Sequence, residues 1–156
     1  MNNYSENLTG IDCDLGCTHY ISEDTAWSLL CGAFEGGSNY WIDHVRIPDR
    51  MKERRAKTLG IPYSHETSKL NYCIASQSWR YTHQIPFLTD GHLFIIPDDT
   101  DGVEHMLDRN ALIQGIEGIA EMDNKSHLQD LISESGDAIT SDLFLQFALF
   151  GEVVYG

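Results

Sequence analysis

Positively charged side chains are scarce in this chain, which has 10 Lys and Arg against 24 Asp and Glu and a formal net charge of −14 at pH 7. Residues 1–45 contain no Lys or Arg, and residues 98–156 contain only Arg109 and Lys125 beside thirteen acids. The one basic segment is residues 46–57. Because like charges repel, this composition argues against direct binding of nucleic acid or anionic lipid. It favours basic proteins, which it attracts over about 8–10 Å at physiological salt.

Long hydrophobic runs are missing as well. No stretch approaches the roughly 20 apolar residues of a membrane span, and residues 1–10 have neither a basic leader nor an apolar run of signal-peptide length. We therefore expect a cytoplasmic protein without membrane contact. Cysteine is rare: four residues are too few for a disulfide scaffold in a chain of 156.

Motifs for metal binding and catalysis are also lacking. Cys13, Cys17 and His19 come nearest to a zinc site, because thiolate and imidazole are preferred zinc ligands. The two cysteines are separated by three residues and no second pair follows, so we predict ordinary loop residues and neither metal nor cofactor. The seven histidines are scattered without an HExxH pair, and no Walker loop occurs. These absences lower the odds of an enzyme without excluding one.

Apolar patterning predicts an α+β fold. We expect a single domain over residues 1–156, with an irregular N-terminal segment over 1–20 and three or four helices packed on a small antiparallel sheet. The predicted strands lie within residues 39–47, 70–75, 79–82 and 92–96. A hairpin turn is predicted at Asp90 and Gly91, because both residues tolerate positive φ.

Capping residues place the first two long helices. Ser22 precedes two acids and is expected to cap a buried helix over 23–35, which ends at a pair of glycines. Asp108 is expected to cap the next helix. Gly115 and Gly118 weaken that helix, and they therefore predict close packing against another element.

The C-terminal part is predicted to contain two further helices. A short one includes residues 128–132, and the last runs from Thr140 to Phe150 and is closed by Gly151. Because this last helix is apolar on all sides, we predict that it is the central core helix.

A dense group of polar residues lies in apolar surroundings, at the end of the first helix and in or beside the last one. Since buried polar groups need hydrogen-bond partners, we expect the two segments to meet. The group comprises Glu35, Ser38, Asn39, Tyr40, Trp41, Asp142, Gln146 and Glu152.

Two functional alternatives for this group stay open. One is a small pocket in which an aromatic face stacks on a nucleotide-like ligand. Its predicted residues are Glu35, Asn39, Tyr40, Trp41, Asp142 and Gln146. The other is an enzyme site with Glu35 or Asp142 as general base.

The acids of the C-terminal third exceed what solubility requires. We expect them to form a partner-binding surface, with carboxylates spaced so that a nucleic-acid-binding groove accepts them in place of phosphates. The predicted residues are Asp98, Asp99, Asp101, Glu104, Asp108, Glu117, Glu121, Asp130 and Glu134. The expected partner is a protein that is basic or binds nucleic acid.

Two segments resemble a family of small acidic proteins encoded by bacteriophages and other mobile elements. The resemblance is carried by AFEGGSNYW at 33–41 and by FLQFALFGEVVYG at 144–156. The family has no settled biochemical activity. The resemblance implies a phage accessory protein that is expressed in the cytoplasm of the bacterial host.

Charge, missing motifs and resemblance together lead to one functional hypothesis. We predict a non-catalytic phage antagonist of a host defence system, which binds a host protein through an acidic, nucleic-acid-mimicking surface. The alternatives are a protein that sequesters a small molecule near 39–41 and a small enzyme. Trp79 and Tyr81 are candidate contacts of a homodimer.

Overall fold

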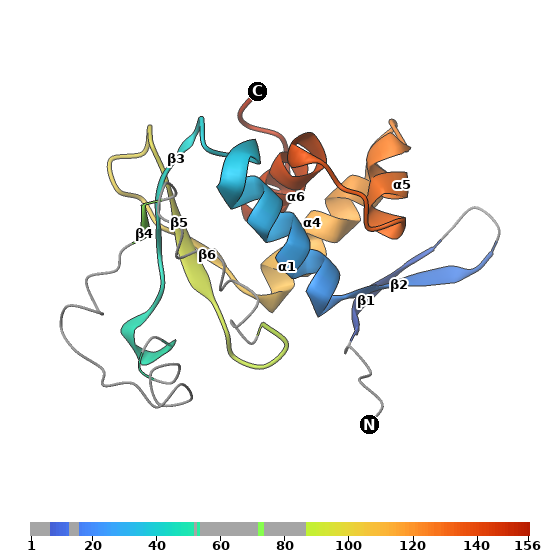
Figure 1. Ribbon diagram of the computed structural model, residues 1–156, viewed down its shortest axis with the longest axis horizontal. Coiled ribbons are helices and arrows are strands. Elements are labelled where there is room, and N and C mark those ends of the chain that lie inside the picture. Colours follow the sequence, from blue (N-terminus) through green and yellow to red (C-terminus); the bar gives the residue numbers. More distant parts are fainter. Residues whose placement is uncertain (1–6, 13–15, 52, 54–71, 74–86) are drawn as a thin grey trace.

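The computed structural model describes residues 7–12, 16–51, 53, 72–73 and 87–156. The chain has the predicted α+β fold in one domain. A small antiparallel sheet lies at one end, a group of helices occupies the centre, and a two-stranded hairpin projects from the other end (Figure 1). No helix of the described part is both long and apolar enough to cross a membrane.

The larger sheet has the strand order β4-β3-β5-β6, with every neighbouring pair antiparallel. Its strands are β3 (Ile42–Arg46), β4 (Tyr72–Cys73), β5 (Leu93–Pro97) and β6 (His105–Leu107). Leu93 and Ile95 alternate toward the core, as the period of a strand requires. The predicted strand at 79–82, with Trp79 and Tyr81, lies outside the described residues.

The predicted hairpin at Asp90 and Gly91 is wrong. Residues 87–90 form a turn rather than a strand, and β5 pairs instead with β6 across the acidic turn that follows it. That turn reverses the chain because Asp101 and Gly102 both adopt positive φ, at 50° and 84°. The Thr100 hydroxyl closes it by donating to the Pro97 carbonyl at 3.0 Å.

The N-terminal segment is more regular than predicted. Within the described residues, β1 (Asn7–Asp12) and β2 (Thr18–Ser22) form an antiparallel hairpin. Leu8 and Ile11 are both buried although they are three residues apart, which a regular strand would not allow. An irregular register between Asn7 and Thr9 accommodates this spacing. The strand therefore lacks the regular alternation of apolar and polar residues by which a strand is predicted from sequence.

Helix α1 (Glu23–Gly32) begins as predicted, because the Ser22 hydroxyl accepts a hydrogen bond from the Thr25 amide at 3.2 Å. The single helix predicted over 23–35 is wrong at its end. The chain widens into a π-helix, η1 (Ala33–Gly37), in which the Ser38 amide donates to the Ala33 carbonyl at 2.8 Å. This wider turn carries the chain on to residues 38–41, which belong to the candidate site.

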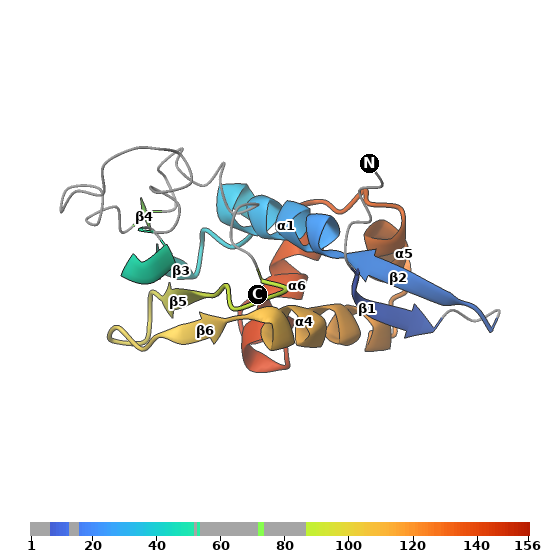
Figure 2. The ribbon, with the colours of Figure 1, turned by 90° about the horizontal axis from the view of Figure 1, so that it is seen from below.

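Helix α6 (Ala138–Phe150) lies between α1 and α4 (Arg109–Glu121), as Figure 2 shows. It is the predicted central helix and contacts α1, η1, α4, α5 (Ser126–Ile132) and β6. Its start was predicted at Thr140, but the cap is Asp137, whose carboxylate accepts from the Thr140 amide at 2.9 Å. Gly151 ends it in the left-handed conformation, as predicted.

Glycines allow the close approach of neighbouring helices to α6. A Cβ at Gly115 of α4 would lie 2.7 Å from the Phe144 carbonyl oxygen, and one at Gly118 would overlap the Phe147 ring. On the other side, a Cβ at Gly37 would overlap the Ala138 carbonyl oxygen. The close packing predicted for Gly115 and Gly118 is therefore confirmed.

Candidate functional site

A buried carboxylate, Asp142 of α6, joins the two polar segments that the sequence predicted to meet. It is 8% exposed. Its Oδ1 accepts hydrogen bonds from Ser38 Oγ and Trp41 Nε1, both at 2.7 Å, and its Oδ2 accepts from Tyr40 Oη at 2.8 Å and Gln146 Nε2 at 2.9 Å. Four donors thus distribute the negative charge of one carboxylate, which makes its burial tolerable.

Local backbone structure brings the three donors of residues 38–41 to α6. After η1, the Ser38 carbonyl accepts from the amides of both Trp41 and Ile42 at 3.2 Å, which holds the segment in a tight turn. Glu35 and Asn39 of the predicted pocket are exposed and make no side-chain hydrogen bond within the described residues. The structure therefore gathers four of the six predicted pocket residues and leaves these two outside.

Tyr40 is a fixed donor in this arrangement. Desolvation, followed by the hydrogen bond to Asp142 and its charge, raises the pKa of Tyr40 to about 12. Its hydroxyl therefore stays protonated at neutral pH and continues to donate to the carboxylate, although 57% of the residue is exposed.

The C-terminal strap, residues 151–156, covers the aromatic face that was predicted to bind a ligand. The Tyr155 ring stacks on Trp41, with centroids 4.9 Å apart and planes 5° apart, and Trp41 is only 2% exposed. Tyr155 Oη donates to Asp99 Oδ1 at 2.7 Å. Burial and then Asp99 raise the pKa of Tyr155 to about 12. A ligand could therefore stack on this Trp41 face only by displacing Tyr155.

Gln146 holds the strap by its main chain. The buried Gln146 Oε1 accepts from the amides of Val154 at 2.8 Å and Tyr155 at 2.7 Å, while its Nε2 donates to the Tyr155 carbonyl at 3.0 Å. Sequence reasoning included Gln146 in the polar group but missed the strap. The strap follows a helix stop and has no periodicity that would signal a packed segment.

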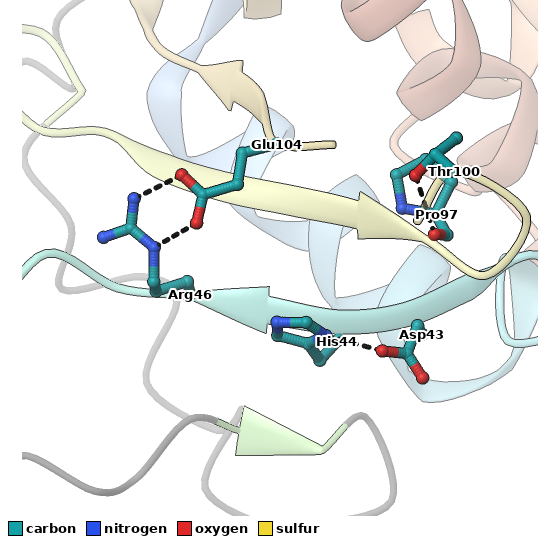
Figure 3. Close-up of polar contacts among 6 residues, drawn as sticks. All are labelled: Asp43, His44, Arg46, Pro97, Thr100 and Glu104. Carbon is teal, nitrogen blue, oxygen red and sulfur yellow. Dashed lines mark hydrogen bonds and ion pairs between the residues drawn. The ribbon is translucent and has the colours of Figure 1, made fainter. Parts of the chain in front are cut away.

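The predicted acids near the sheet include several that make structural contacts. Asp98, Asp99 and Asp101 lie in the exposed β5–β6 turn, where Asp99 accepts from Tyr155. Glu104 pairs with Arg46, with Nε to Oε1 at 2.5 Å and Nη2 to Oε2 at 2.6 Å (Figure 3). This pairing lowers the pKa of Glu104 and raises that of Arg46. Glu104 therefore has less free charge to offer a partner.

The remaining predicted acids lie on the helices. The Asp108 carboxylate caps α4 by accepting from the Ala111 amide at 2.9 Å. Glu117 and Glu121 are exposed on α4 and make no side-chain hydrogen bond or ion pair within the described part of the chain. The nine carboxylates thus come from three places in the fold: the β5–β6 hairpin, α4 and α5 with its following turn.

Asp130 and Glu134 meet α1 at a pocket of about 180 Å³. The Asp130 carboxylate accepts from Thr140 Oγ1 at 3.0 Å, and the Glu134 carboxylate accepts from Thr25 Oγ1 at 2.8 Å. Every charged residue in the lining is acidic, and sequence reasoning did not select Asp24. The lining residues are Asp24, Thr25, Ser28, Leu29, Asp130, Leu131, Glu134 and Gly136.

The described residues contain no group of three His, Cys, Asp or Glu side chains that could hold a metal ion. Cys13 of the predicted zinc candidate lies outside the described residues, while Cys17 is exposed. His19 lies in strand β2 rather than in the predicted loop. The prediction that these three residues bind no metal stays a prediction.

Comparison with protein-family models, with curated proteins and with solved structures found no match to this chain. The resemblance to small phage proteins at 33–41 and 144–156 is therefore still a prediction.

Proposed function

We propose that the chain is a phage-encoded antagonist of a host defence system, which binds a basic or nucleic-acid-binding host protein without catalysis. The observation that carries the proposal is the acid-lined pocket between α1 and α5, formed by Asp24, Asp130 and Glu134. The net charge of −14 supports it, because a negative surface accelerates encounter with a basic partner.

The pocket fits one basic side chain better than it fits a free ligand. Its volume of about 180 Å³ is below the roughly 300–1,000 Å³ that is usual for small-molecule sites. Three carboxylates with no basic residue in the lining repel phosphate, and they favour the ammonium of Lys or the guanidinium of Arg. A partner surface with one projecting cation would thus use the pocket as an anchor.

Two threonines orient the pocket before a partner arrives. Thr25 donates to Glu134 at 2.8 Å and Thr140 donates to Asp130 at 3.0 Å, and both threonines are buried. Each hydroxyl occupies one carboxylate oxygen, while a carboxylate can accept about four hydrogen bonds in total. Both acids therefore keep acceptor capacity for a cation and lose little freedom on binding.

Charge-neutral variants with a matched control test the proposal. The pocket variant combines Asp24→Asn, Asp130→Asn and Glu134→Gln. The control combines Glu117→Gln, Glu121→Gln and Asp123→Asn, which remove three charges from α4 and the segment after it. Both are used to capture basic proteins from host lysate at low and at raised salt.

We expect the pocket variant to lose at least about tenfold in capture of a specific basic protein, because a cation seated in the pocket contacts several carboxylates at once, whereas isolated exposed charges contribute little. The control should change mainly the salt dependence. Equal losses in the two variants would contradict the pocket as anchor and point to a diffuse acidic surface. Failure of the unmodified chain to capture any basic protein would reject the proposed function.

A further inference from the structure

The C-terminal strap is bound in the manner of an extended peptide ligand. Gln146 contacts the main chain of Val154 and Tyr155 through three hydrogen bonds, and one side chain, Tyr155, enters an aromatic slot. Main-chain hydrogen bonds combined with a side-chain slot are how proteins commonly recognise extended peptides. None of these contacts depends on the covalent link between the strap and α6.

The slot specifies a tyrosine. Its walls are the Trp41 ring, stacked on Tyr155, and the Phe150 ring, whose centroid lies 5.9 Å from that of Tyr155 at an angle of 62°. At its end, Asp99 accepts from the phenolic hydroxyl at 2.7 Å. An aromatic ring with a hydroxyl donor packs against both rings and donates to Asp99, whereas an aliphatic side chain leaves Asp99 without this donor.

Much of the strap is exposed to solvent. Gly151 connects it to α6 with φ of 72°, and Glu152 is exposed. Val153 and Val154 are 46% and 51% exposed, so only one side of the strap contacts the protein. By contrast, Trp41 lies in the hydrophobic core and Gln146 lies on α6, and both side chains are buried while the strap is bound.

We propose that the cleft formed by Trp41, Gln146, Phe150 and Asp99 is a binding site for an extended peptide segment that carries a tyrosine, and that the chain's own strap occupies it as an exchangeable ligand. This site is separate from the acid-lined pocket, since the two share no lining residue. A partner segment would bind by replacing the strap. Its binding would release Val153 and Val154 for other contacts.

Competition by the tethered strap sets the expected affinities. A short linker gives the strap an effective concentration of roughly millimolar at the cleft, so an external peptide binds weakly to the unmodified chain. A substitution that weakens strap binding should increase the fraction of molecules with an empty cleft. The apparent affinity for the peptide should rise by the same factor. The cleft itself is unchanged by substitutions in the strap.

The test uses the chain of residues 1–156 and a labelled peptide with the sequence of residues 151–156, and binding is followed by fluorescence anisotropy. We expect the Tyr155→Ala chain to bind this peptide at least tenfold more tightly than the unmodified chain does. The matched control is Tyr20→Ala, which removes an exposed tyrosine from β2 and should leave the affinity unchanged. The same peptide with Tyr155→Ala should bind none of the chains.

A second variant tests the proposal independently, in case the Tyr155→Ala chain does not fold. Val154→Pro removes one amide that donates to Gln146 and leaves every cleft residue and Tyr155 intact. It too should bind the peptide more tightly than the unmodified chain, and the Trp41 indole proton should shift in NMR spectra on binding. If either variant is folded by circular dichroism and gains no affinity, or if the peptide with Tyr155→Ala binds equally well, the proposal is overturned.

Amide exchange in the unmodified chain supplies a test that needs no substitution. We expect the Val154 and Tyr155 amides to exchange with solvent faster than the amides in the middle of α6, because the strap opens without global unfolding. Exchange of all these amides at the single rate of global unfolding would show that the strap does not leave the cleft, and would overturn the proposal.

Discussion

Two carboxylate regions of this molecule differ in what their acids have left to offer. Asp142 is 8% exposed, and its two carboxylate oxygens accept four hydrogen bonds. A carboxylate has about four acceptor positions in total, so those of Asp142 are all occupied. Asp130 and Glu134 of the acid-lined pocket are both more exposed, and each accepts one side-chain hydrogen bond from a threonine. The buried carboxylate therefore has no free acceptor position, whereas the carboxylates of the acid-lined pocket still have acceptor positions for a partner.

Residue type alone therefore does not identify a binding carboxylate. Asp142 lies among the predicted pocket residues, yet its contacts join the turn that follows η1 to α6. Asp24 was predicted only as an acid in the first turn of a helix, yet it lines a cavity with two other acids. The number of protein donors that already bond to a carboxylate distinguishes one that stabilises the fold from one that can bind a partner.

Removing each acid separately should give the largest difference in stability between the two regions. Asp142→Ala should lower the free energy of unfolding by about 3–5 kcal/mol, because Ser38, Trp41 and two further donors lose their acceptor in a buried setting. Asp130→Ala should cost about 1 kcal/mol, since one hydroxyl is affected. Urea denaturation measures both, and similar losses would show that the two acids are equivalent.

A glycine substitution tests the element that brings the donors to Asp142. Gly37→Ala should destabilise by about 1–3 kcal/mol, because its Cβ would overlap the Ala138 carbonyl oxygen and push η1 away from α6. Gly36→Ala is a matched control in the same π-helix, since nothing lies within 4 Å of its added Cβ. Thermal unfolding compares the two. A Gly36 variant as unstable as the Gly37 variant would contradict steric packing as the cause.

Alkaline pH tests the contribution of the tyrosine donors to stability. Tyr40 and Tyr155 have pKa values raised from 10.0 to about 12, so they hold their protons more tightly in the folded chain than in the unfolded one. The stabilisation they provide is complete below pH 10 and is lost as pH rises toward 12. Tyr40→Phe should reduce this dependence in urea denaturation series, while Tyr20→Phe should keep it. An unchanged dependence in Tyr40→Phe would exclude Tyr40 as its source.

Sequence reasoning found the parts of the fold that depend on local chemistry. Ser22, Asp108 and Gly151 cap their helices as expected, because a capping residue acts within one turn. The contact between Trp41 and Asp142 was also predictable, since polar groups in two apolar segments need partners.

Features that depend on distant or irregular contacts were not predictable. The β1–β2 hairpin was missed because Leu8 and Ile11 share a face only through an irregular register. The acid-lined pocket joins Asp24 to Glu134, which lie on α1 and just after α5, and no spacing rule connects them. Tyr155 gave no sign that it would fill the slot on Trp41, because a single aromatic residue after a helix stop has no pattern.

The smallest expected effect on stability is at Glu134, and it separates folding from binding. Glu134→Gln keeps an oxygen that can accept from Thr25 but removes the negative charge from the pocket. Because the change is conservative and Glu134 is exposed, the free energy of unfolding should move by less than about 0.5 kcal/mol. Binding of the basic partner should nevertheless weaken, since a cation in the pocket loses one of three carboxylates. A parallel loss of stability and binding would mean that Glu134, like Asp142, serves the fold.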